Sequence, residues 1–290
     1  MGRVVYLNGR FVDKKDARIS VFDHGLLYGD GVFEGIRSYN RLVFRLKEHI
    51  NRLYQSAGAI ELEIPVSKGE MVKAVVDTLR KNRLNDAYIR LVVTRGYGDL
   101  GLDPRKCRGH ASVFIITDKI MLYPKKFYEN GLHIIAAKTK KNYKEAIHPN
   151  IKSLNYLNNI LAKIDAIKKN APEAIMLTYN NYVSECTGDN IFIIKGRTLV
   201  TPPREIALRG ITQEAVIDMA GKMRVSFREK NVRIGDICCA KECFLTGTAA
   251  EIIPVTRVDK CVVGNGRPGP ITLRLMAGFK EMTKTDGIKY

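Results

Sequence analysis

A lysine stands just ahead of a short helical pattern in the stretch IKSLNYLNNILAK, residues 151–163. The apolar residues that follow recur at the spacing of one buried helical face, with Ser153 as a suitable N-cap: Leu154, Leu157, Leu161 and Ile164. A lysine there needs an anionic partner, a hydrogen-bond network or a covalent use such as a Schiff base, because an isolated ammonium is costly to desolvate. Taken alone, Lys152 fits an ion-paired structural role better than a covalent one.

A glutamate further along the chain changes that balance. In VSECTGDNIFII, Glu185 ends a strand-like run, and the turn 188–190 leads into an apolar strand suited to a buried sheet. The carboxylate is able to cap the turn. It is equally able to hold the protonated pyridine nitrogen of pyridoxal phosphate, a contact that lets the ring accept electrons from a substrate carbanion.

Two turns of small residues are suited to a phosphate. Gly210, Ile211 and Thr212 come immediately before an amphipathic helix, so backbone N–H groups and the positive end of the helix dipole face one point. The small residues of the turn at 247–249 allow a phosphate the same close approach to the backbone. Turns with such residues are also common where no ligand binds.

Alternation along two predicted strands adds a candidate pocket. In VFEGIRSY and AYIRLVVT, these residues share inward faces: Phe33, Gly35, Arg37 and Tyr39 in the first, Tyr88 and Arg90 in the second. Aromatic rings, a glycine and arginines suit a small zwitterion with an apolar side chain. Taken singly, each arginine is also explained as a surface residue and each aromatic as a core residue.

The elements that position these residues predict an α+β fold. The first part of the chain alternates strands with hairpins that turn at Asn8-Gly9 and near Asn40. Helical spacing predicts helices over 48–60 and 68–82, and strand character resumes at AYIRLVVTRG and ASVFIITD.

A break in this pattern predicts two domains. Pro124 and paired lysines indicate an interdomain linker at 118–128. The linker separates a small N-terminal α/β domain, 1–117, from a larger C-terminal domain, 129–290, which would carry Lys152.

The composition predicts a soluble globular protein with a basic surface. The chain has 290 residues, 45% of them hydrophobic, and 48 Lys and Arg against 30 Asp and Glu, a formal net charge of +18. Such a charge attracts phosphates, anionic metabolites or nucleic acid. Scattered lysine runs without interleaved aromatics favour a solvated surface over a nucleic-acid groove: Lys14-Lys15, Lys125-Lys126, Lys140-Lys141 and Lys168-Lys169.

Neither export nor a metal site is indicated. No charged-then-apolar leader opens the chain, and no apolar run approaches the roughly 18 residues of a membrane span, so we expect a cytoplasmic protein. The six cysteines form no CxxC pair. We expect them to be reduced, mostly buried thiols that bind no metal.

One glycine pattern matches a dinucleotide-binding motif but lacks the structural context of one. Residues 96–101 fit GxGxxG after a predicted strand, and Asp118 lies near the spacing of a dinucleotide ribose contact. Pro104 interrupts the short segment before the next strand, whereas a parallel crossover needs a dozen or more residues. We therefore expect the glycines to shape a loop over a site.

A series of motifs gives a resemblance over nearly the whole chain. In order, they are YGDGVFEGIR, HINRL, AYIR, IKSLNYLNN, SECTGDNIF, LRGIT and GTAAEI. This order resembles the fold-type IV pyridoxal-phosphate enzymes of D-amino-acid aminotransferase-like architecture, most closely the branched-chain amino-acid aminotransferases. The resemblance implies two domains with the cofactor at their interface, and a homodimer or higher homo-oligomer.

The implied activity is that of a ping-pong aminotransferase in branched-chain amino-acid biosynthesis. The amino group moves between leucine, isoleucine or valine and 2-oxoglutarate. Lys152 would bind pyridoxal 5'-phosphate as a Schiff base and shuttle the proton, and Glu185 would pair with the pyridine nitrogen. Tyr156 would lie near the phenolic oxygen, although its spacing from Lys152 is one residue shorter than in some members. The residues implied for the phosphate are Arg52 of HINRL, Ile211, Thr212 and Thr248.

Substrate recognition is implied in the same way. The pocket positions are Phe33, Gly35, Arg37, Tyr88 and Tyr123. Backbone groups of Thr248 and Ala249 would meet the substrate carboxylate, and Arg90 with Tyr28 of the partner subunit would engage the distal carboxylate of glutamate. Because one pocket accepts an aliphatic side chain and a carboxylate in turn, its arginine belongs at the rim.

Other activities occur on this fold, so the fold does not choose the reaction. D-Amino-acid aminotransferases carry an Arg-x-His pair soon after TRG, whereas Arg108-Gly109-His110 arrives here only at the next strand. AYIR and GTAAE favour the branched-chain group over these enzymes and over aminodeoxychorismate lyases. A basic nucleic-acid-associated protein without the chemistry is the remote alternative, which would have no need for both Lys152 and Glu185.

Overall fold

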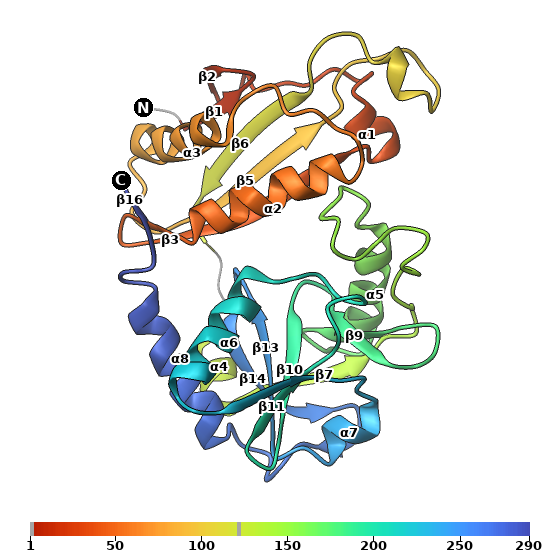
Figure 1. The fold of residues 1–290 in the computed structure, drawn as a ribbon, viewed down its shortest axis with the longest axis vertical. Helices are drawn as coiled ribbons and strands as arrows, with labels where there is room; N and C mark the ends of the chain where they lie inside the picture. The colour runs from red at the N-terminus through yellow and green to blue at the C-terminus, as the bar shows by residue number, and fades with distance from the viewer. Residues whose placement is uncertain (1–2, 121–122) are drawn as a thin grey trace. The chain divides into compact units, whose positions relative to one another are not determined.

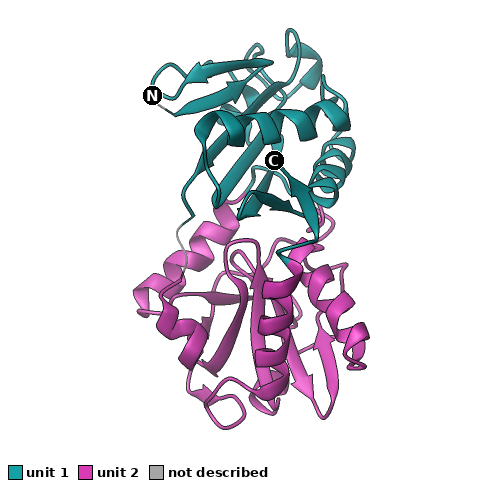
Figure 2. Cartoon of the chain, turned by 90° about the vertical axis from the view of Figure 1, so that its left-hand side faces the viewer, with its two compact units in different colours: residues 1–120, 151–155, 283–290 teal, residues 121–150, 156–282 magenta. Residues whose placement is uncertain are grey.

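The computed structural model describes residues 3–120 and 123–290 and divides into two compact units (Figure 2). Unit 1 contains the chain up to residue 120 together with 151–155 and 283–290, and unit 2 contains the rest. The predicted domains, 1–117 and 129–290, differ from these units because Lys152 and the C-terminal residues belong to unit 1. Residues 121 and 122 of the predicted linker lie outside the described residues.

Backbone pairing accounts for both differences. Phe33 N donates to Lys152 O at 3.0 Å, and Leu154 N donates to Gly31 O at 2.9 Å. These bonds attach the lysine segment to a strand of unit 1. The C-terminal residues 287–289 form a strand antiparallel to 42–44.

Unit 1 is a seven-stranded antiparallel sheet with two helices on one face (Figure 1). Its strands, in spatial order, are β16 (Gly287–Lys289), β4 (Leu42–Phe44), β3 (Gly31–Tyr39), β5 (Ala87–Thr94), β6 (Ser112–Asp118), β1 (Val4–Leu7) and β2 (Arg10–Asp13). Its helices are α1 (His24–Tyr28), α2 (Leu46–Gly58), α3 (Lys68–Asn82) and the 3-10 turn η1 (Pro104–Lys106). The core between α2, α3 and the sheet includes Ile36, Leu53, Met71, Leu79 and Ile89.

The hairpins and helices predicted for this part of the chain are confirmed. Asn8 and Gly9 have φ of 46° and 85° between β1 and β2, and Asn40 has φ of 43° between β3 and β4. Ser67 Oγ accepts from Glu70 N at 3.2 Å and Glu70 Oε2 accepts from Ser67 N at 2.7 Å, a capping box that starts α3.

Unit 2 is a nine-stranded mixed sheet (Figure 1). Its strands, in spatial order, are β12 (Ser226–Glu229), β11 (Thr198–Thr201), β10 (Asn190–Lys195), β13 (Glu242–Gly247), β14 (Glu251–Val258), β7 (Leu132–Ala136), β8 (Ala174–Leu177) and β9 (Val183–Cys186), and β15 (Cys261–Val262) pairs with β14. Its helices are α4 (Lys125–Asn130), α5 (Leu157–Lys168), α6 (Ile211–Lys222), α7 (Ile234–Cys238) and α8 (Pro270–Met282). Helices α6 and α8 pack against each other and against β13.

Two predictions about helix α5 are wrong. It begins at Leu157 with Tyr156 at the N-cap position, so Ser153 is not its cap. The leucine face is not buried either, since Leu157, Leu161 and Ile164 are 67%, 45% and 38% exposed. The small-residue face of the helix is buried instead, in a cluster of mainly small residues: Ile135, Ala137, Ala162, Ala166, Ala171, Ala174 and Met176. Helical periodicity identifies a face but not its partner, and a close fit against β8 requires alanines.

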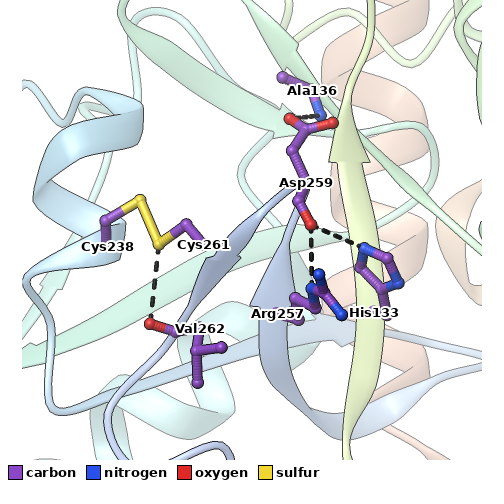
Figure 3. The surroundings of a disulfide bond; sticks show 7 residues. All are labelled: His133, Ala136, Cys238, Arg257, Asp259, Cys261 and Val262. Carbon is purple, nitrogen blue, oxygen red and sulfur yellow. Dashed lines mark hydrogen bonds between the residues drawn. A yellow bond between two sulfur atoms is a disulfide. The ribbon is translucent and has the colours of Figure 1, made fainter.

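The prediction that all cysteines are reduced is wrong for one pair. Cys238, at the end of α7, forms a disulfide with Cys261 of β15, with 5.8 Å between their Cα atoms (Figure 3). Near this bond, the Asp259 side chain accepts from Ala136 N at 3.0 Å, and Asp259 O accepts from His133 Nε2 at 3.0 Å (Figure 3). The fold brings the two cysteines within bonding range although 23 positions separate them.

Within the described ranges, no helix is long and apolar enough to cross a membrane.

Candidate active site

The register of β3 and β5 brings together the pocket residues predicted from strand alternation. Gly35 lies opposite Arg90, and Arg37 lies opposite Tyr88. A Cβ atom added to Gly35 would lie 2.4 Å from Tyr88 Oη, so a larger residue there would require this tyrosine to shift. The Arg37 guanidinium carbon lies 4.3 Å from the centre of the Tyr39 ring.

Lys152 lies beside the same residues. Its Nζ is 4.6 Å from the centre of the Phe33 ring, and the guanidinium carbon of Arg90 is also 4.6 Å from that centre. Arg90 Nη2 donates to Tyr88 Oη at 2.8 Å. Lys152 N donates to Ser56 Oγ at 3.1 Å, so the backbone of the lysine is fixed as well. The structure thus unites an amine, two aromatic rings and an arginine in unit 1.

Arg52, the predicted phosphate ligand, is held by a buried carboxylate. Its Nε and Nη2 each lie 2.7 Å from an oxygen of Glu34, and His49 Nδ1 lies 2.8 Å from Glu34 Oε2. Burial opposes the ionisation of Glu34, but Arg52 and His49 outweigh it and lower its pKa to about 2. Burial lowers the pKa of His49, and Glu34 only partly offsets this effect. His49 is therefore neutral and donates its Nδ1–H to the carboxylate.

Sequence reasoning missed Glu34 and His49. A signal was present, because strand alternation places Glu34 on the same face as Val32 and Ile36, both fully buried. A charged residue on a core-facing strand position requires a partner. His49 and Arg52, three apart on α2, supply it.

Glu185 is the anionic group of the second set of predicted residues, which lies in unit 2. The side chain is 8% exposed and pairs with Lys141. Its Oε2 accepts from Leu208 N at 3.0 Å and from Asn190 Nδ2 at 3.4 Å. Such a fixed, buried carboxylate suits the protonated nitrogen of a cofactor ring.

The first turn of α6 and the turn after β13 are suited to a phosphate. Ile211 and Thr212 open the helix, and Gly210 precedes it as N-cap. A Cβ on Gly210 would lie 2.0 Å from Asn190 Oδ1, so a larger residue there would displace the Asn190 side chain. Thr246 Oγ1, at the end of β13, is buried without a hydrogen-bond partner among the described residues. An unsatisfied buried hydroxyl beside these turns fits a site that receives an acceptor-rich ligand.

The remaining predicted residues lie in turns, at helix ends and beside a cavity. Thr248 and Ala249 form the turn between β13 and β14, and Tyr156 is half-buried before α5. Tyr28 ends α1, where its Oη accepts from Gly101 N at 3.0 Å. Tyr123 borders a cavity of about 600 Å³ in unit 2, formed with Tyr128, Glu251, Leu273, Met276 and Phe279, and burial raises its pKa.

The GxGxxG stretch is a loop and not a dinucleotide site. Strands β5 and β6 on either side of it are antiparallel neighbours, so the segment is no parallel crossover. Asp118 pairs with Arg3. Arg108 Nη2 lies 2.6 Å from Asp99 Oδ2 in the same exposed loop.

The fold and the arrangement of these residues agree with the expected transaminase that uses pyridoxal phosphate. The family model described as amino-transferase class IV matches residues 31–258. This chain therefore belongs to the class IV aminotransferases.

Individual relatives are similar over almost their full length. A Methanocaldococcus jannaschii protein, provisionally named a branched-chain-amino-acid aminotransferase, is 50% identical over 286 residues, which are 98% of each chain. The crystal structure of the Escherichia coli branched-chain amino acid aminotransferase has a TM-score of 0.94 at 34% identity, covering 99% of this chain and 97% of that one. The branched-chain aminotransferase from the thermophilic archaeon Thermoproteus uzoniensis, solved with norvaline, has a TM-score of 0.91 at 36% identity, covering 99% and 96%.

Proposed function

We propose that this aminotransferase moves the amino group between branched-chain L-amino acids and 2-oxoglutarate. The pocket of unit 1 carries the proposal, because Phe33 and Tyr88 offer apolar walls while Arg90 offers a cation beside Lys152. An aliphatic side chain packs against the rings. A distal carboxylate pairs with the arginine. Another similar branched-chain aminotransferase, solved in complex with N-(5'-phosphopyridoxyl)-L-glutamate, supports the second substrate.

The residues of this chain provide binding and proton transfer. Bound pyridoxal phosphate supplies an electron sink for the substrate carbon that loses its proton. The Lys152 amine would take the proton from that carbon and deliver it to the cofactor carbon that is bonded to the same nitrogen. Glu185 would accept the N–H of the cofactor ring, and Tyr156 would lie near its phenolic oxygen. The residues that would hold the phosphate are Arg52, Ile211, Thr212 and Thr248.

The remaining residues select the substrate. The residues proposed to contact the substrate side chain are Phe33, Gly35, Arg37, Tyr88 and Tyr123. Backbone groups of Thr248 and Ala249 bind the carboxylate next to the amino group. Arg90 and Tyr28 of the partner subunit bind the distal carboxylate of glutamate.

The proposal includes a homodimer or higher homo-oligomer. Unit 1 exposes several large apolar side chains, Val21, Phe22, Leu26, Leu100 and Leu102, of which Leu102 is 82% exposed, and Gly101 N in the same loop donates to Tyr28 Oη of α1. Exposed apolar side chains are typical of a protein–protein interface where they form one patch. Light scattering should show at least a dimer, and Leu26→Asp should reduce its stability while Tyr179→Asp, at an exposed site of unit 2, should not. The proposed setting is branched-chain amino-acid biosynthesis in the cytoplasm.

The visible absorbance of the purified protein tests the reaction. After L-leucine or D-alanine is added to separate samples, we expect only L-leucine to convert the bound cofactor to pyridoxamine phosphate. Conversion by D-alanine alone would assign the enzyme to the D-specific group. No cofactor band, even after pyridoxal phosphate is added, would refute the proposal and leave a non-catalytic nucleic-acid-associated role.

Lys152→Ala tests the role of the amine. Turnover should be abolished while the cofactor still binds, since the backbone bonds at this position do not depend on the side chain. Lys138→Ala, at an exposed lysine, is the matched control. Steady-state kinetics of the unaltered enzyme should give parallel double-reciprocal lines, and converging lines would exclude the two-step scheme.

A further inference from the structure

Lys141 is a buried lysine to which the proposed function gives no role. The scattered lysine runs predict that Lys140 and Lys141 are both solvated. Lys140 is exposed and donates to Asn181 Oδ1. The Lys141 side chain is only 10% exposed, and its Nζ pairs with Glu185 Oε1. The prediction is therefore wrong for Lys141, because the fold brings a buried carboxylate next to it.

The position of this ion pair is fixed from several sides. Lys141 N donates to Leu177 O at 2.9 Å, which anchors the backbone of the lysine. Glu185 Oε2 accepts from Leu208 N at 3.0 Å and from Asn190 Nδ2 at 3.4 Å, and the same Asn190 nitrogen donates to Leu208 O at 2.8 Å. Both oxygens of Glu185 are thus engaged before any ligand arrives.

The surroundings of Lys141 favour its protonated form. Burial alone would lower its pKa, but Glu185 outweighs burial and raises it, and Tyr156 adds to the rise. Lys141 therefore stays protonated at neutral pH. In general, a buried carboxylate without a cation is costly to keep charged, because desolvation disfavours the charged form.

We propose that Lys141 is a positioning residue for the cofactor ring, which holds Glu185 ionised and oriented to accept the ring N–H. The inference rests on the proposed function, in which Glu185 binds the ring nitrogen. Lys141 need not touch the cofactor, since it acts through the carboxylate. The electrostatic effect of Tyr156 on Lys141 places a second residue implied for the cofactor near the same cation.

Three variants of the full chain separate this role from simple packing. Lys141→Met removes the charge at similar length, Lys141→Arg keeps it, and Lys140→Met alters the exposed neighbour. A cavity of about 280 Å³ borders Lys141, Tyr182 and Ile206 and offers room for the larger guanidinium. The double variant Lys141→Met, Glu185→Gln removes both charges and keeps the test valid if the single change impairs folding.

Two measurements follow. Infrared difference spectra of the cofactor-free proteins should show the carbonyl band of a protonated carboxyl group in Lys141→Met, but not in the double variant or in Lys141→Arg. Titration with pyridoxal phosphate should show affinity at least about tenfold weaker in Lys141→Met, with recovery in Lys141→Arg. In the Glu185→Gln background, Lys141→Met should have little further effect.

The outcomes separate the inference from the proposed function. An unchanged affinity and no carboxyl band in Lys141→Met would overturn the role of Lys141. So would an equal loss of affinity in the Glu185→Gln background. If the unaltered protein fails to bind pyridoxal phosphate, the proposed function fails, whereas the infrared result still decides whether Lys141 keeps Glu185 ionised.

Discussion

Glu34 accepts a hydrogen bond from each of two nitrogens of Arg52, Nε and Nη2, at 2.7 Å. The paired geometry restricts the guanidinium to one orientation. Because Glu34 is fully buried, this pair is costly to break from either side. The arginine proposed to bind the cofactor phosphate is therefore in place before the cofactor binds.

Glu34→Gln should lower the free energy of unfolding at pH 7 by about 3–5 kcal/mol, because Arg52 would lose its buried counter-charge. Urea denaturation measures the change. Glu63→Gln, at an exposed glutamate of the same unit, should change stability little. An equal effect of both substitutions would contradict the importance of the buried pair.

The same pair predicts a pH dependence. The pKa of Glu34 is lowered from 4.5 to about 2, so its stabilisation is complete above pH 4.5 and is lost as the pH falls toward 2. The stability difference between the unaltered protein and Glu34→Gln should be constant from pH 7 to 5 and shrink from pH 4.5 to 3. A difference that stays constant down to pH 3 would exclude a titration of Glu34 in this range.

Gly35→Ala should impair recognition of larger side chains. The added Cβ would lie 2.4 Å from Tyr88 Oη, which must move and weaken its bond to Arg90. We expect kcat/KM for L-leucine to fall at least about tenfold. Gly58→Ala, where nothing lies within 4 Å of the added atom, is the control. Unchanged kinetics in Gly35→Ala would remove Gly35 from the pocket.

Arg90→Gln should separate the two half-reactions. Loss of a charged partner should raise the KM for 2-oxoglutarate at least about tenfold, while that for L-leucine changes little. Single-turnover absorbance with each substrate measures the two steps. Arg105→Gln, whose side chain is 88% exposed, serves as control. If both substrates were affected equally, Arg90 would not be the group that selects the carboxylate.

Reduction of the disulfide between Cys238 and Cys261 should destabilise the protein by about 3 kcal/mol, since the bond closes a loop between residues 23 positions apart. For a unit of this size, the melting temperature should fall by roughly 6–12 °C. Cys238→Ser should reproduce the fall, and Cys239→Ser, at an exposed free thiol, should not. A melting temperature that does not change when reductant is added would show that the bond adds no stability.

The sequence alone determined the local features of the fold. Asn8-Gly9 predicted a hairpin because few residues adopt positive φ readily. Alternation predicted which side of β3 carries Phe33, Gly35 and Arg37, because the period of two is a property of the backbone. Motif order was sufficient to suggest the family, which the comparisons confirm.

Only the tertiary structure decided which distant groups meet. Glu34 with Arg52, Lys141 with Glu185, and Cys238 with Cys261 are partners across long stretches of chain, and no local rule pairs them. The same holds for α5, where periodicity found the leucine face but packing buried the alanines. Backbone preferences act between near neighbours, whereas burial and ion pairing depend on which distant elements the folded chain brings into contact.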